Sequence, residues 1–387
     1  MTFRILQVLI ILLPFVLIPN QFECFRSIKE TIFQCAGIMI IAASFFDSKI
    51  REYKNKPLTY LIIYMALLFV RYFSVSYMWG GTIDGVYWRS IQNTWCLIPT
   101  FNMVLGFIML KVIIENIDRE QVLQLSRLVC YVTAIISVHM ILQKFDVMQV
   151  YGREAVYNGT HTGKNYTGWL ANNRVISFIG NPMLAGSYVA LASHFNLLFN
   201  EKKHYIFYVL GLGACIATMT TSSLLTFVVM MMIFLLVYYR KIGIPLLVLG
   251  TLGGLMAFKH SEFISSSHRV EIWKKAIKGW WEVPYTGAGL GSFRIQKFVD
   301  ITGTQWWQAH SEPLQFLFET GLIGLGIIFW VLVDFFKKIT LDREVFIFTL
   351  IIFGGLVNSF FSFPLHIAPI VFVLILAFGF REILKED

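Results

Sequence analysis

The chain has 387 residues, of which 57% are hydrophobic and 14% are charged. Soluble domains usually carry about 25% charged residues, so this little charge could not cover the apolar side chains in water. The composition excludes a disordered chain and a disulfide-stapled secreted protein, and it argues against a soluble enzyme. The net charge of +9 is explained better by cytoplasmic loops and contact with anionic lipid than by nucleic acid, which we do not expect as a partner.

A membrane-spanning helix needs about 20 mostly apolar residues. Twelve segments approach this pattern, so we expect an all-α, polytopic membrane protein with about twelve transmembrane helices. The segments lie near residues 4–19, 29–46, 58–79, 92–114, 122–144, 182–199, 204–220, 222–239, 242–258, 318–336, 344–361 and 367–381. The first follows Arg4 as in a signal peptide, but residues 19–23 offer no small-residue cleavage site, so we expect a retained span.

Positive charge alternates between the loops that join these segments. If the N-terminus lies inside, the inside loops hold Lys49, Arg51, Lys54, Lys56, Lys111, Arg119, Arg127, Lys202, Lys203, Arg240, Lys241, Lys337, Lys338 and Arg343. The short outside loops hold only Arg26, Lys29 and Arg89. The positive-inside rule therefore predicts that both termini are cytoplasmic.

Two outside segments are long, near 145–181 and 259–317. Long excursions in compact proteins usually carry function. We therefore divide the chain into a transmembrane bundle of about nine helices over 1–258, which includes the loop 145–181, a large helical loop domain over 259–317, and C-terminal transmembrane helices over 318–387.

The larger loop begins with a predicted amphipathic helix over 268–281, capped by Ser265–Ser267. Val270, Trp273, Ile277 and Trp280 recur at helical spacing and are expected to form its apolar face. Such a helix suits either the membrane interface or a lid on the bundle. Arg269 lies at its N-terminal end, where the helix start and a guanidinium both favour an anion such as phosphate.

Residues 287–293 (Gly-Ala-Gly-Leu-Gly-Ser-Phe) form a glycine-rich stretch that no predicted strand precedes. A tight turn is favoured over direct phosphate binding through Gly287 and Gly289. His310 then comes directly before Ser311, Glu312 and Pro313, which predict the start of a helix that continues into the membrane. A histidine at such a place is either a structural hydrogen bonder or a base.

The order of these segments resembles the O-antigen ligase and O-antigen polymerase superfamily. The resemblance rests on residues 269–273, 287–293, 309–315 and 319–324, together with 174–185 and 358–366. Ser311 stands where the family often has Asn, and residues 220–223 lack an arginine that the family often has, so neither of those contacts is carried over.

The resemblance implies a bacterial inner-membrane glycosyltransferase of the GT-C type. It implies a glycan on undecaprenyl diphosphate as donor, used at the periplasmic face, and lipid A core, a protein or another glycan as acceptor. It implies His310 as the group that activates the acceptor hydroxyl, and Arg174 and Arg269 as the groups that hold the diphosphate.

This chemistry is self-consistent. Histidine suits proton removal near neutral pH, and arginine can meet the charge of a diphosphate leaving group. Arginine can do this without a metal, and the acids of the outside loops are scattered. We therefore expect no cofactor, no metal and an inverting displacement. Further candidates for lining the site are Arg71 within the third apolar segment, Gly287, Gly289, Glu319 and His366.

Three alternatives stay open. A polymerase would join lipid-linked repeat units instead of transferring the glycan to a different acceptor, and the sequence does not separate it from a ligase. A solute transporter would share the twelve spans and cytoplasmic termini, but transporters usually bind substrate at midplane within internal repeats, and no repeat is visible. A non-catalytic scaffold for envelope assembly is the third.

Overall fold

A computed structural model of the chain describes residues 1–16, 27–54, 56–57, 59–67, 89–147, 175–248, 267–295, 298–299, 305–306, 308–337 and 339–386. This part is helical apart from one antiparallel pair of two-residue strands, which confirms the all-α class. The helices are α1 (Thr2–Phe15), α2 (Ser27–Ala43), α4 (Arg89–Asn116), α5 (Arg119–Lys144), α7 (Pro182–Ala192), α8 (Lys202–Ala217), α9 (Thr221–Tyr238), α11 (Ser267–Glu282), α12 (Ser292–Ile295), α13 (Glu312–Phe336), α14 (Arg343–Ser359) and α15 (Ala368–Glu386). Short 3-10 helices are η1 (Ser177–Ile179), η2 (Ser193–Leu198) and η3 (Pro364–His366), and the strands are β1 (Phe298–Val299) and β2 (Gln305–Trp306).

Each of the twelve expected segments contains helical residues in its described part. Among the described helices, α5, α9 and α13 are long and apolar enough to cross a membrane. These helices indicate a membrane protein. The count of twelve spans stays a prediction, because parts of the segments near 58–79 and 242–258 lie outside the described residues.

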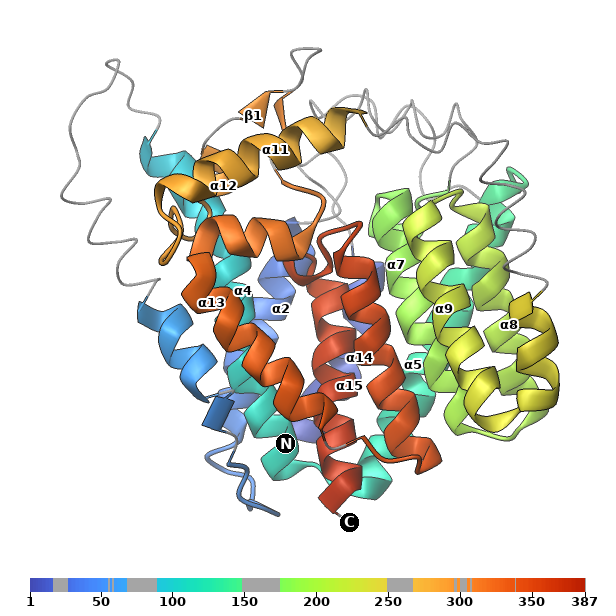
Figure 1. Ribbon diagram of the computed structural model, residues 1–387. Helices are drawn as coiled ribbons and strands as arrows, with labels where there is room; N and C mark the ends of the chain where they lie inside the picture. Colours follow the sequence, from blue (N-terminus) through green and yellow to red (C-terminus); the bar gives the residue numbers. More distant parts are fainter. Residues whose placement is uncertain are drawn as a thin grey trace.

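The centre of the bundle is formed by α14 and α15, which pack against each other. α15 also packs against α4, and α14 packs against α9 (Figure 1). Phenylalanine rings fill the space between them: Phe348 lies edge-on to Phe195 and Phe380, with ring centroids 5.5 and 5.7 Å apart. Edge-on rings of this kind are a favourable aromatic arrangement, so the abundant phenylalanine supplies much of the packing.

Charged contacts gather at the end of the bundle where both termini lie (Figure 1). The N-terminal amine meets Asp47 at 2.6 Å, and Arg119 meets Glu344 at 2.9 Å. Arg343 donates to the side-chain oxygen of Asn200 at 2.7 Å. Loops far apart in the chain, all among those expected inside, thus meet at one end, whereas α11 lies across the opposite end.

At this charged end, Asp118 begins α5 with reciprocal side-chain caps. Its carboxylate accepts from the Gln121 backbone N–H at 2.8 Å, and the Gln121 side chain accepts from the Asp118 N–H at 3.3 Å. Replacing Asp118 by alanine is expected to lower the free energy of unfolding by about 1 kcal/mol, because helix donors lose their partner. Thermal unfolding in detergent measures the change. Asp118→Asn keeps an acceptor and is the control; an alanine variant as stable as wild type would contradict this role of the cap.

Candidate active site

The end of the bundle opposite the termini is covered by α11, which packs on α13. Ile272 and Ala276 of α11 are fully buried in a cluster with Phe293, Ala309 and Phe318. Gly279 allows the close approach, because a Cβ there would lie 2.9 Å from the Phe318 ring. This helix therefore rests on the bundle as a fixed cover.

The face of α11 that packs on the bundle is not the apolar face recognised in the sequence. The sequence left open whether this apolar face meets the membrane interface or packs on the bundle; its residues Val270 and Ile277 are 37% and 42% exposed, so they do not pack on the bundle. The buried stripe instead runs through Ile272 and Ala276. Arg269 lies three residues before Ile272, on the same side of the helix, since positions three and four apart share a face.

The glycine-rich stretch after α11 is docked through its backbone onto a break in α13. The Ala288 N–H donates to Phe318 O at 2.9 Å, and the Gly289 N–H donates to Glu319 O at 3.0 Å. The backbone of Gly321 is non-helical, with φ 66° and ψ −167°. The expected helix near 318–336 therefore begins earlier, at Glu312. It changes direction where residues 287–293, which we call the glycine turn, are hydrogen-bonded to it.

Glycine is required on both sides of this contact. Gly287 has φ +69°, and a Cβ there would lie 2.5 Å from the backbone of Glu319 and Thr320. Gly321 would place a Cβ 2.4 Å from Tyr285 O. The tight turn predicted at Gly287 and Gly289 thus accounts for the observed backbone contacts.

His310 lies next to the contact between the glycine turn and α13, in the segment that leads into α13. Its φ is +51°, a left-handed conformation that is uncommon for a residue with a side chain and is concentrated at functional sites. The preceding Ala309 is held from two sides: its carbonyl accepts from Trp273 Nε1 at 2.8 Å, and its N–H donates to Gln315 Oε1 at 3.2 Å. The His310 ring meets Phe363 edge-on, with centroids 5.1 Å apart. The neighbours of His310 thus fix an unfavourable backbone geometry.

His310 and Arg269 interact electrostatically. Burial, and then the positive charge of Arg269, lower the pKa of His310 from 6.5 to about 4. Burial also lowers the pKa of Arg269 from its ordinary value. His310 is therefore neutral at pH 7 and able to accept a proton, while the partly buried guanidinium beside it is suited to an anion.

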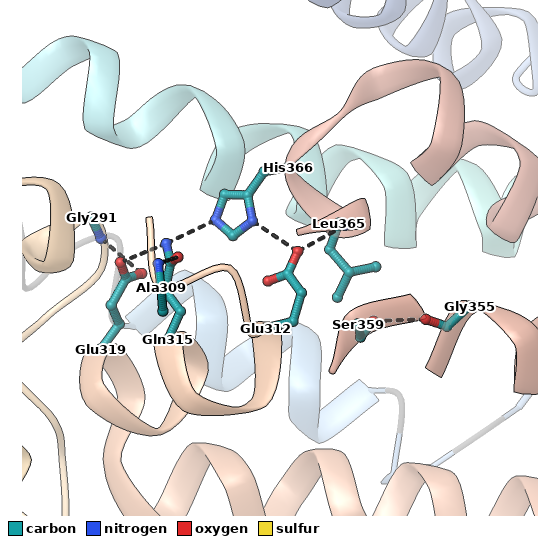
Figure 2. Close-up of polar contacts among 9 residues, drawn as sticks. All are labelled: Gly291, Ala309, Glu312, Gln315, Glu319, Gly355, Ser359, Leu365 and His366. Carbon is teal, nitrogen blue, oxygen red and sulfur yellow. Dashed lines mark hydrogen bonds and ion pairs between the residues drawn. The ribbon is translucent and has the colours of Figure 1, made fainter. Parts of the chain in front are cut away.

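A chain of polar contacts connects the segment around Ala309 to η3 (Figure 2). Gln315 Nε2 lies 3.3 Å from both Glu319 Oε1 and His366 Nε2. His366 Nδ1 in turn lies 2.9 Å from Glu312 Oε1. The second Glu319 oxygen accepts from the Gly291 N–H at 3.0 Å. The network therefore ties together the glycine turn, the first two turns of α13 and η3.

Of the residues that the sequence singled out, Arg269, Gly287, Gly289, His310, Glu319 and His366 gather at this end of the bundle. Arg71 and Arg174 lie outside the described residues. The third expected span does approach the site, because Tyr64 OH donates to Thr320 O at 2.8 Å.

Three residues of the site were given no site role from the sequence: Glu312, Gln315 and Trp273. Glu312, Gln315 and Glu319 recur at helical spacing at the start of an apolar helix, and this polar stripe was the available signal. Trp273 was assigned to an apolar face, although an indole N–H at a buried position needs an acceptor. Ser311 is the N-cap residue of α13, but its side chain makes no capping hydrogen bond.

His139 and His194 are buried within the bundle. His139 Nδ1 lies 3.0 Å from Ser177 Oγ. His194 lies 2.8 Å from Ala190 O and 3.0 Å from Tyr208 OH. The described residues contain no group of three His, Cys, Asp or Glu side chains that could hold a metal ion.

Residues 206–329 match the model of a protein family described as O-antigen ligase. The matched range begins in α8 and ends in α13, so it includes Arg269, the glycine turn, His310 and the polar residues of α13. His366 lies beyond it. No curated protein matches the chain significantly.

Proposed function

We propose that this chain, whose residues 206–329 match the O-antigen ligase family model, transfers a glycan from an undecaprenyl-diphosphate carrier to an acceptor at the periplasmic face of the bacterial inner membrane. The observation that carries the proposal is that the charge of Arg269, on α11, acts on the strained, partly buried His310 and lowers its pKa. Both lie within the matched range, so the family assignment and the geometry point to the same place.

In this reaction the acceptor oxygen bonds to the anomeric carbon while the bond from that carbon to the diphosphate oxygen breaks. The bonding electron pair leaves with the diphosphate, which Arg269 stabilises, and the acceptor proton passes to His310. One displacement inverts the anomeric centre and needs no cofactor. A product that keeps the donor's anomeric configuration would contradict single displacement.

The distribution of charge supports the proposed orientation. The end with both termini carries the basic loops, and such loops remain in the cytoplasm. The site end then faces the periplasm, where the donor is presented. Twelve spans, with a loop domain over 259–317 between a bundle over 1–258 and C-terminal helices over 318–387, remain our proposal for the membrane layout, as does the participation of Arg71 and Arg174.

The test is transfer in vitro from a purified lipid-diphosphate glycan, with three acceptors offered separately. Transfer to lipid A core or to a protein identifies a ligase. Transfer to a second lipid-linked repeat identifies a polymerase, the alternative that the family also contains. Absence of transfer to every acceptor, by protein that is folded and in lipid, would end the proposal.

Arg269 gives a prediction for donor binding. Arg269→Ala is expected to lower kcat/KM for the donor by about 10- to 100-fold, because a charge-assisted bidentate contact to phosphate is lost. Arg269→Lys should fall between, since lysine keeps the charge without the fork. Removing the positive charge should also raise the pKa of His310, moving the acid limb of kcat/KM upward. Steady-state kinetics over a pH series measure both effects.

Lys274→Ala is the matched control, because Lys274 is an exposed cation on the same helix. It should leave kcat/KM unchanged. Equal losses in the two alanine variants would mean that the helix contributes only its overall charge.

A further inference from the structure

Two N–H groups in this polar network can only donate, and they fix the direction of its hydrogen bonds. The backbone N–H of Ala309 can only donate, so the Gln315 atom that it meets at 3.2 Å is the amide oxygen. The amide nitrogen of Gln315 must then face Glu319 Oε1 and His366 Nε2. An amide nitrogen also can only donate, so His366 Nε2 is an acceptor and carries no proton.

The other side of His366 gives the same answer. Leu365 N–H donates to Glu312 Oε1 at 2.9 Å, which makes that oxygen an acceptor. His366 Nδ1 meets the same oxygen at 2.9 Å and therefore carries the ring proton. The Glu312 side chain is only 6% exposed, so these donors replace water around the carboxylate. His366 is thus neutral, with a proton at Nδ1 and a lone pair at Nε2.

This protonation state has a consequence for the neighbouring loop. The lone pair of His366 and the carboxylate of Glu319 together take both amide protons of Gln315 (Figure 2). With its nitrogen held in this way, Gln315 can present only its oxygen to Ala309. That hydrogen bond, together with Trp273 from the opposite side, holds the backbone that carries His310 at φ +51°.

We propose that His366 is a positioning residue of the transfer reaction: through the lone pair at Nε2 it orients Gln315, and Gln315 holds the Ala309–His310 backbone in the geometry used for catalysis. Glu312 selects the tautomer that makes this possible. Among the described residues, Glu312 and Glu319 are the charged groups that face His366. The activity part of this inference rests on the transfer function proposed above, whereas its structural part does not.

Two substitutions separate the two nitrogens of His366. His366→Gln places an amide oxygen near the position of Nε2 and can still accept from Gln315. His366→Asn places an amide nitrogen near the position of Nδ1, so it keeps the donor to Glu312 and loses the acceptor. Gln315→Met, which removes the amide at similar volume, should reproduce the loss in a second way.

Hydrogen–deuterium exchange of the peptide that contains Ala309 is the first measurement, on purified protein in lipid nanodiscs at one pH. Exchange at Ala309 should be faster by about five- to tenfold in His366→Asn and Gln315→Met, the change expected for one lost hydrogen bond. His366→Gln should stay within about twofold of wild type. Equal exchange in all four proteins, or His366→Gln changing as much as His366→Asn, overturns the proposal.

Kinetics provide the second measurement. His366→Asn should lower kcat by about tenfold with an unchanged KM for the donor, because Arg269 is untouched, and His366→Gln should restore kcat. A rise in KM with unchanged kcat would assign His366 to donor binding and overturn the positioning role. If wild-type protein shows no transfer at all, the proposed function fails, but the exchange result still decides the hydrogen-bond network.

Discussion

Replacing His310 by alanine is expected to lower kcat for glycan transfer by about 10²- to 10⁴-fold, the usual contribution of a positioned base. The acceptor proton would then have no side chain to receive it, while Arg269 would still bind the diphosphate. KM for the donor should therefore change little. The measurement is a single-turnover assay with a lipid-diphosphate donor, at matched amounts of wild type and variant in lipid.

The pH dependence of wild type should carry the signature of the burial of His310. The pKa of about 4 belongs to the site without substrate, where Arg269 opposes protonation. The acid limb of kcat/KM, which reports the free enzyme, should therefore lie near pH 4. A bound diphosphate would offset the charge of Arg269 and favour the imidazolium, so the acid limb of kcat should lie at higher pH.

Two results would remove His310 from this role. One is full transfer activity in His310→Ala. The other is an acid limb of kcat/KM that stays in place when Arg269 is replaced, because the charge of Arg269 contributes to the pKa of His310. A His310→Ala protein that unfolds at the wild-type temperature is the condition for interpreting either result.

Replacing Gly321 by alanine is expected to lower the free energy of unfolding by at least about 2 kcal/mol. At φ 66° and ψ −167° the backbone occupies a region open essentially to glycine, and the new methyl group would lie 2.4 Å from Tyr285 O. Strain and overpacking each cost about 1–3 kcal/mol. The expected consequence is separation of the glycine turn from α13, with loss of transfer, measured by thermal unfolding and by activity.

Two glycines of the same region separate these causes. Gly326 lies farther along α13 with open space around it, so Gly326→Ala should be neutral. Gly289 has φ +102°, but a Cβ added there would have no atom within 4 Å, so Gly289→Ala measures backbone strain without a steric clash. The predicted order of destabilisation is Gly321, then Gly289, then Gly326. A Gly321→Ala protein as stable as Gly326→Ala would show that α13 does not need the break.

Several residues that the sequence singled out lie together at one end of the molecule. Arg269, the glycine turn and His310 come from short patterns whose chemistry is local: a helix start that attracts anions, glycines that permit positive φ, and a histidine before a proline-marked helix. The polar stripe of Glu312, Gln315 and Glu319 could be recognised from its spacing, but the residues that it contacts could not. Its partner His366 lies 54 residues from Glu312, and no local pattern encodes that pairing.

Composition and periodicity by themselves determined that this is an all-helical membrane protein, because apolar length acts through the lipid and needs no partner. The tertiary structure alone decided which stripe of α11 is buried, where α13 breaks, and which ring nitrogen of His366 carries the proton. Each of these depends on a contact between segments far apart in the chain, and such a contact exists only after the bundle has closed.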